Sequence, residues 1–261
     1  MRERAAPEFV FGLHPVLEAL RARRRRLIRL LIREDLKRAD LGALCDLALA
    51  AGVAVERMPR RELEGMLPSG ARNQGLVLEA GPLPAPPLEE LQTLDVLPGE
   101  ARRLVALDGV EDPQNLGAVI RVAEAAGALG LILTSRRAPP LGAAVSRASA
   151  GAVEHLPVSR VGNLRRALEQ LKEGGFWAIG ADPDAAEDLF LTPDRIWQGD
   201  LVLVFGSEGR GLRRAVVEAL DHRVRIPMAG RVGSLNVAAA AAVVLFHARL
   251  RSSQGRGENT P

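Results

Sequence analysis

The sequence predicts an α/β protein: a larger C-terminal domain built on a parallel sheet, preceded by a smaller N-terminal α/β domain. Three segments, which begin at Leu104, Leu201 and Val224, carry this prediction. Each reads as an apolar strand, a polar or glycine-rich turn and then a helical pattern. Strands that alternate with helices form parallel sheets, which bind ligands beyond the carboxyl ends of their strands. We therefore expect the polar residues of the three turns to meet at one edge of the sheet.

The N-terminal domain is predicted over residues 1–80 as an alternation of short helices and strands. The predicted helices are 13–21, 41–51 and 60–67, and the predicted strands are 27–33, 53–57 and 75–79. Residues 81–101 hold five prolines, a composition that is typical of a semi-rigid linker.

The C-terminal domain is predicted over residues 102–251. Helices are expected to separate its strands, which are 104–107, 130–133, 176–180, 201–205 and 223–226. Residues 252–261 are polar and rich in small residues, so we expect a disordered tail.

The segment 201–212, LVLVFGSEGRGL, joins a strand to a glycine-rich turn that carries Glu208. A helix is expected to follow over 212–220. The glycines fall as G-x-x-G-x-G, unlike the dinucleotide fingerprint G-x-G-x-x-G, and a carboxylate among them repels a pyrophosphate. A cationic ligand suits this turn better, and S-adenosylmethionine, a nucleoside with a sulfonium and no phosphate, is one such ligand. The alternative is a tight turn with an exposed glutamate.

The other two segments supply polar residues at comparable places. In the first segment, Asn115 can cap a helix that continues through Arg121. The alternative to a functional role is that Asn115 is only a helix cap and Arg121 only a solvated arginine. In the last, Ser234 is the expected N-cap of a long alanine-rich helix, and Asn236 stands at the start of this helix. Capping does not explain why three turns in succession carry such residues.

The three segments resemble the three motifs of the SpoU or TrmH-type RNA ribose 2′-O-methyltransferases, which belong to the SPOUT superfamily. The matching stretches are LDGVEDPQNLGAVIRVAEAAG, LVLVFGSEGRGL and IPMAGRVGSLNVAAAAAVVLF. The N-terminal stretches FVFGLHPVLEAL and NQGLVLEA are similar to those of the members that methylate guanosine in bacterial 23S rRNA. The resemblance implies a trefoil-knotted C-terminal domain, with the knot from about Leu201 onward, and an N-terminal RNA-binding domain like ribosomal protein L30e.

The resemblance also implies the reaction, which is S-adenosylmethionine-dependent 2′-O-methylation of a ribose, that of a guanosine in 23S rRNA. The implied catalytic residues are Asn115, Arg121, Glu208, Ser234 and Asn236. The implied cofactor contacts come from the backbone near Gly206, Ile226 and Leu235. An arginine normally stays protonated, so Arg121 is better suited to hold a phosphate or stabilise the attacking oxygen than to act as a base. Two alternatives stay open: a 2′-O-methyltransferase for tRNA or another rRNA site, and a non-catalytic RNA-binding protein.

Charge and composition favour an RNA partner and argue against a membrane or metal protein. Only two of the 35 basic residues are lysines, and arginine forks suit phosphate. The densest cluster has five arginines between Arg21 and Arg26, and its members Arg23, Arg24, Arg25 and Arg26 are expected to contact RNA, the alternative being a solvated charge run. No apolar run reaches 18 residues, and a single cysteine leaves no cysteine-based metal cluster. The cytoplasm is the expected compartment.

The final helix predicts a homodimer. The apolar residues between Val237 and Leu250 cover more than one helix face, so the helix needs more than one partner surface. The resemblance implies that the knotted region packs against its twin and that each active site is completed across a two-fold interface.

Overall fold

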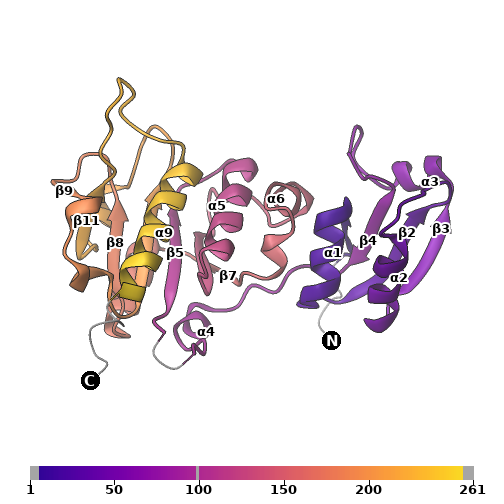
Figure 1. The fold of residues 1–261 in the computed structure, drawn as a ribbon, viewed down its shortest axis with the longest axis horizontal. Helices are drawn as coiled ribbons and strands as arrows, with labels where there is room; N and C mark the ends of the chain where they lie inside the picture. Colours follow the sequence, from indigo (N-terminus) through magenta and orange to yellow (C-terminus); the bar gives the residue numbers. More distant parts are fainter. Residues whose placement is uncertain (1–5, 98–99, 255–261) are drawn as a thin grey trace. The chain divides into compact units, whose positions relative to one another are not determined.

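The computed structural model describes residues 6–97 and 100–254, and Figure 1 shows the order of its elements. The contacts divide the chain into two units, neither of which is one continuous stretch. The first unit holds residues up to Pro84 together with Pro140–His155, and the second holds Ala85–Pro139 and the residues from Leu156 onward. The predicted C-terminal domain therefore contributes residues 140–155 to the first unit.

A four-stranded sheet forms the centre of the first unit. Its strands are β1 (Glu8–Phe11), β2 (Leu27–Arg33), β3 (Ala54–Met58) and β4 (Leu76–Ala80), in the order β1-β4-β2-β3. Strand β2 pairs with β3 in parallel, and β4 pairs antiparallel with both β1 and β2. The sequence predictions include β2, β3 and β4 but not β1, whose four residues are too few for a clear alternation.

Both faces of this sheet are covered, because successive side chains of a strand point to opposite sides. On one face, Leu30 and Ile32 of β2 pack against helices α1 (Leu13–Ala22) and α2 (Leu41–Ala50). On the other face, Leu31 packs with Leu63 of helix α3 (Arg60–Gly65).

A buried ion pair ties residues 140–155 into the first unit. This segment forms helix α6 (Ala143–Ala148) and the 3₁₀ helix η1 (Ala152–Glu154). The Arg25 guanidinium donates to both Glu154 carboxylate oxygens, at 3.0 and 2.8 Å, and the two side chains are 1% and 0% exposed. Arg25 also donates to Glu8 at 3.1 Å. Burial raises the pKa of Glu154, and Arg25 and Arg24 act against that shift.

The second unit is built on a seven-stranded parallel sheet in the order β7-β6-β5-β10-β8-β11-β9. The strands are β5 (Arg103–Asp108), β6 (Gly130–Thr134), β7 (Val158–Val161), β8 (Trp177–Ala181), β9 (Glu187–Asp188), β10 (Leu201–Gly206) and β11 (His222–Arg225). The five predicted strands are all present. The additional strands β7 and β9 lie at the two edges of the sheet and are too short to give a pattern.

Helices cover both faces of this sheet. Helix α7 (Leu164–Glu173) packs with α4 (Leu88–Gln92) and α8 (Arg214–Val217) in one apolar cluster, while α5 (Pro113–Ala125) and α9 (Val237–Gln254) lie side by side (Figure 1). The proline-rich segment thus contains α4, whose Leu88 and Leu91 are buried in that cluster. The helix expected over 212–220 is wrong in extent, because only α8 is helical there.

Helix α9 also runs past Arg251 to Gln254, whereas the tail was predicted to begin at residue 252. The rest of the predicted tail, 255–261, lies outside the described residues. Among the described residues, no helix is long and apolar enough to cross a membrane, and no group of three metal-ligating side chains occurs.

Candidate functional site

The carboxyl ends of β5 and β10 meet at the centre of the sheet, where Asp108 pairs in register with Gly206. After Gly206 the chain turns back so tightly that Ser207 bridges to Gly211. A Cβ atom on Gly206 would lie 2.2 Å from the carbonyl carbon of Gly211, so only glycine fits at this position. Glu208 is held at the tip of this turn.

An ion pair between distant residues fixes the end of the turn. The Asp108 carboxylate is fully buried and accepts from the backbone N–H of Arg213 at 2.8 Å and from its Nε at 2.6 Å. The main chain after β10 is thereby joined to the end of β5. Sequence reasoning did not select Asp108 or Arg213, although a carboxylate at the end of a buried strand is a usable signal.

Three of the predicted site residues form one hydrogen-bonded network. The side-chain amide of Asn236 donates to Asn115 Oδ1 at 2.9 Å and to Glu208 Oε1 at 2.5 Å. Both amide hydrogens are thus engaged, and Asn236 Oδ1 accepts from the Ala238 N–H at 2.9 Å. The network joins the first turn of α5, the turn after β10 and the start of α9. The sequence predicted that these three turns meet, and the structure confirms it.

Two capping predictions are wrong: Asn115 is not a cap, and Asn236 caps α9 with its side-chain oxygen while its amide nitrogen donates to the network. Asp112, not Asn115, caps α5, because its carboxylate accepts from the N–H groups of Gln114 and Asn115. Pro113 occupies the first helical position, where a missing N–H costs nothing. Asn236, not Ser234, caps α9, which begins one residue later.

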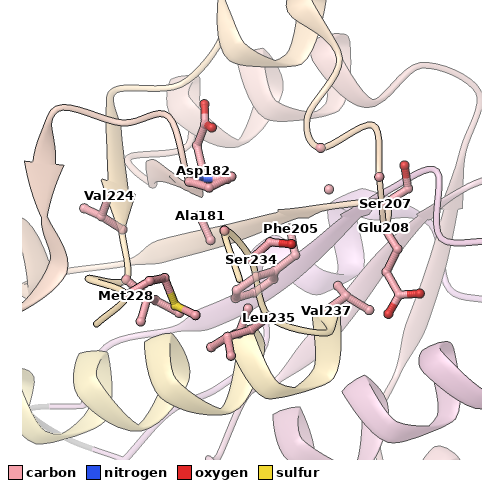
Figure 2. Close-up of a pocket in the computed structure, with 17 residues that line it drawn as sticks. Ala181, Asp182, Phe205, Ser207, Glu208, Val224, Met228, Ser234, Leu235 and Val237 are labelled. Carbon is pink, nitrogen blue, oxygen red and sulfur yellow. The ribbon is translucent and has the colours of Figure 1, made fainter. Parts of the chain in front are cut away.

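A mostly apolar pocket lies beside the network (Figure 2). It takes its walls from the turn after β10, the end of β8, the loop before α9 and α9 itself. In Figure 2, Met228 lies at one end of the pocket and Glu208 at the other. The pocket contains five of the predicted residues: Gly206, Glu208, Ile226, Ser234 and Leu235. The strand end at β8, which adds Ala181, Asp182 and Pro183 to the pocket, has no distinctive motif and was not predicted as part of the site.

Arg121 does not join these residues within the second unit. It is exposed on α5, lines neither the pocket nor the neighbouring cleft that contains Asn115, and has no hydrogen-bond or ion-pair partner among residues 6–97 and 100–254. Its guanidinium is therefore available to a group outside this chain.

The predicted RNA-contact cluster of the first unit divides into exposed and buried members. Arg23 and Arg26 are exposed, and Arg24 is half-buried with its guanidinium on the Glu154 carbonyl oxygen. Burial lowers the pKa of Arg24. Arg25 is 6% exposed and fully engaged with carboxylates and the Gly81 carbonyl, so its side chain does not face solvent. Because Arg25 is buried, only its neighbours in the arginine cluster can contact RNA.

Two family models match the chain, and together they cover most of it. Residues 102–246 match the SpoU rRNA Methylase family, and residues 9–86 match the RNA 2′-O ribose methyltransferase substrate binding domain.

The similarity to known proteins and solved structures covers nearly the full length of this chain. The putative TrmH family tRNA/rRNA methyltransferase YacO of Bacillus subtilis is 37% identical over 92% of this chain and 94% of its own. The 23S rRNA (guanosine-2′-O-)-methyltransferase RlmB of Vibrio vulnificus is 36% identical over 92% of this chain and 96% of its own.

Among solved structures, the SpoU methyltransferase AviRb of Streptomyces viridochromogenes, in complex with the cofactor S-adenosylmethionine, superposes with a TM-score of 0.78 at 26% identity. The match covers 97% of this chain and 94% of that one. The parallel sheet and the preceding substrate-binding domain confirm the predicted fold class. With a family model over more than half of its length and relatives of this similarity, the chain belongs to the SpoU family of RNA methyltransferases.

Proposed function

We propose that this protein transfers a methyl group from S-adenosylmethionine to the 2′-oxygen of a guanosine ribose in 23S rRNA. The observation that carries the proposal is the network of Asn236, Asn115 and Glu208, which stands where the apolar pocket meets a second, polar cleft. One compartment suits a nucleoside cofactor and the other suits a nucleic acid. The reacting groups would meet between them.

The pocket fits S-adenosylmethionine by its chemistry. Phe205, Leu235 and Val237 offer apolar surface to an adenosine, while the main chain at Gly206 is open to close approach. Glu208 supplies a carboxylate, which attracts a positively charged sulfonium, and the described residues of the lining include no arginine or lysine that would repel it. When bound, S-adenosylmethionine supplies the methyl group on that sulfonium.

The residues of the network position the acceptor ribose. Asn236 holds Glu208 and Asn115 in fixed directions, which leaves the second Glu208 oxygen free to accept from a ribose hydroxyl. Holding the 2′-oxygen in line with the methyl carbon lowers the barrier because the orientation is fixed before reaction. Negative charge develops on this oxygen as its proton leaves, and a positioned guanidinium stabilises it. We assign that part to Arg121.

Because Arg121 lines neither compartment in one subunit, we propose that a homodimer completes the site. Helix α9 exposes Phe246 and Leu250, at 48% and 55%, next to α5, which carries Arg121. Exposed apolar side chains that lie together on one helix are typical of a subunit interface, and two-fold dimers are the commonest arrangement. A second copy on this face would bring Arg121 of the partner subunit near the network.

The target RNA is inferred from the relatives and the first unit. The proteins named RlmB carry 23S rRNA guanosine in their names, and the similarity extends through the N-terminal substrate-binding domain. Arg23 and Arg26 of the first unit are the exposed members of the arginine cluster that we assign to RNA phosphates. A ribosomal RNA substrate places the reaction in the cytoplasm. The name of the TrmH family relative favours a second candidate, methylation of tRNA.

The experiment is a methyl-transfer assay with purified protein, S-adenosylmethionine and separate 23S rRNA and tRNA transcripts, followed by mass spectrometry of the nucleosides. We expect 2′-O-methylguanosine from 23S rRNA. A methyl group on a base would refute the mechanism, while ribose methylation of tRNA alone would establish the second candidate. Calorimetry with S-adenosylmethionine tests the cofactor independently of any RNA.

A further inference from the structure

A second cleft of about 730 Å³ lies against the proposed reaction site, entirely within the second unit. It shares Ser207, Glu208 and Val237 with the apolar pocket and also contains Asn115. Its walls are the loops that follow β5, β6, β7 and β10, together with the first turn of α7. The cleft therefore begins at the network and extends across the sheet edge towards β7.

Five arginines line this cleft, and they divide into two that are paired and three that are not. Arg213 is bound to Asp108, and Arg165 pairs with Glu169 and Glu218. The other three are Arg136, Arg137 and Arg210, which are exposed and whose side chains make no hydrogen bond or ion pair within the described part of the chain. Such guanidiniums present all five donors to a ligand.

The acidic residues that the structure describes in the lining come from the end of β5, the loop after it and the turn after β10, and none of them from the loop that carries Arg136 and Arg137. Asp108 is neutralised by Arg213, and Asp112 is engaged as the α5 cap. Glu208 belongs to the network with Asn236, at the end of the cleft next to the apolar pocket. Glu111 is the remaining carboxylate among the described residues of the lining. Arg136 and Arg137 come from a different loop, after β6, so the cleft is positively charged on that side.

The loop that carries Arg136 and Arg137 has a defined backbone conformation. Arg137 has φ +62°, in the left-handed region that non-glycine residues rarely adopt, whereas Arg136 next to it does not. The carbonyl oxygen of Arg136 accepts from the Thr134 hydroxyl at 2.9 Å, which anchors the start of the loop to the end of β6.

We propose that this cleft binds the phosphodiester backbone of the RNA strand adjacent to the target ribose, with Arg136 and Arg137 holding its phosphates. The proposal rests on the proposed function, since it names how the substrate of the same site is held. The lining, as far as the structure describes it, contains no Phe, Trp or Tyr, so it offers no aromatic platform for base stacking. The cleft therefore binds phosphates and positions the strand without reading its sequence.

The test compares the double variant Arg136→Ala/Arg137→Ala with the matched control Arg166→Ala/Arg195→Ala. The control removes the same charge at two exposed positions of the second unit that line neither compartment. The probes are a single-stranded oligouridylate and a 23S rRNA transcript, each titrated over a range of salt. We expect the log–log salt slope for the oligouridylate to fall by about 1.4, at about 0.7 for each single-strand phosphate that the variant no longer neutralises. The control should keep the wild-type slope.

Two further measurements separate this inference from the proposed function. S-adenosylmethionine binding by the double variant should equal that of wild type, because neither arginine lines the apolar pocket. The variant Arg136→Lys/Arg137→Lys should recover most of the slope, since it keeps the charges. An unchanged slope in the alanine variant, or an equal loss in the control, overturns the cleft assignment even if the wild type methylates rRNA. Failure of the wild type to bind S-adenosylmethionine would instead contradict the proposed function, whatever the slopes.

Discussion

Replacing Glu154 by leucine removes one partner of the buried ion pair with Arg25, whose two side chains are 0% and 1% exposed. Breaking a buried pair costs about 3–5 kcal/mol because the remaining charge is left without its counterpart. Glu8 still accepts from Arg25 at 3.1 Å, so we expect the lower end, about 3 kcal/mol. At about 4 °C per kcal/mol for a unit of this size, the melting temperature of the first unit should fall by roughly 12 °C.

The double variant Arg25→Met/Glu154→Leu provides the decisive comparison. Replacing both ions by apolar side chains is often neutral or stabilising, so the double variant should melt near the wild-type temperature. Scanning calorimetry of the two single variants, the double variant and wild type gives the coupling energy. The RNA affinity and salt slope of the double variant should match those of wild type, because Arg25 does not face solvent. A loss below about 1 kcal/mol in the Glu154→Leu variant, or an additive loss in the double variant, would contradict the expected coupling of Arg25 and Glu154.

The remaining predictions concern pH, the site and the dimer. Burial raises the pKa of Glu154 above the ordinary value of 4.5, so the stability that protonation of this group adds is complete below pH 4.5 and is lost as the pH rises through the folded pKa. In urea unfolding, the stability of wild type should therefore fall relative to that of the double variant over this pH range, because the double variant lacks the titrating group. Asn236→Asp keeps the α9 cap but loses both donated hydrogen bonds, so its turnover should fall by about 100-fold. Asn236→Ala should also lose about 1 kcal/mol of stability, because the cap is removed as well. Equal turnover in wild type and Asn236→Asp would show that the network has no part in the reaction. Arg121→Ala and Arg121→Lys should both abolish turnover and leave S-adenosylmethionine binding unchanged in calorimetry, because a point charge cannot reproduce the guanidinium fork. Ala239→Arg, on the exposed side of α9, should lower both the particle mass measured by light scattering and the activity, whereas the control Gln198→Arg should change neither. A fully active monomer would contradict a shared site.

The meeting of the three turns could be predicted because the carboxyl ends of parallel strands lie at one edge of a sheet. Glu208, Asn115 and Asn236 each stand at or just after such a turn, so strand–turn–helix periodicity was enough to bring them together. Gly206 and Ile226, which line the apolar pocket, were expected there from the family resemblance alone.

Long-range pairing could not be predicted from local pattern. Asp108 and Arg213 are 105 positions apart, and the sequence around either residue does not show that the two form an ion pair. Arg25 is likewise one of several successive arginines, and only the packing of residues 140–155 distinguishes it as the buried one. The caps were misassigned because Asp112 and Asn115, or Ser234 and Asn236, are equally good capping residues by type. The placement of Arg121 away from both compartments depends on the side of α5 that the core occupies.

Mapping of 2′-O-methylated nucleotides in ribosomal and transfer RNA, from cells with and without the gene, is the direct test of ribose methylation in 23S rRNA. We expect that one guanosine of 23S rRNA loses its ribose methyl group in cells without the gene and regains it when the gene is restored. Restoring the Arg121→Ala variant should leave that position unmethylated. Unchanged ribose methylation throughout 23S rRNA in cells without the gene would contradict the proposed function.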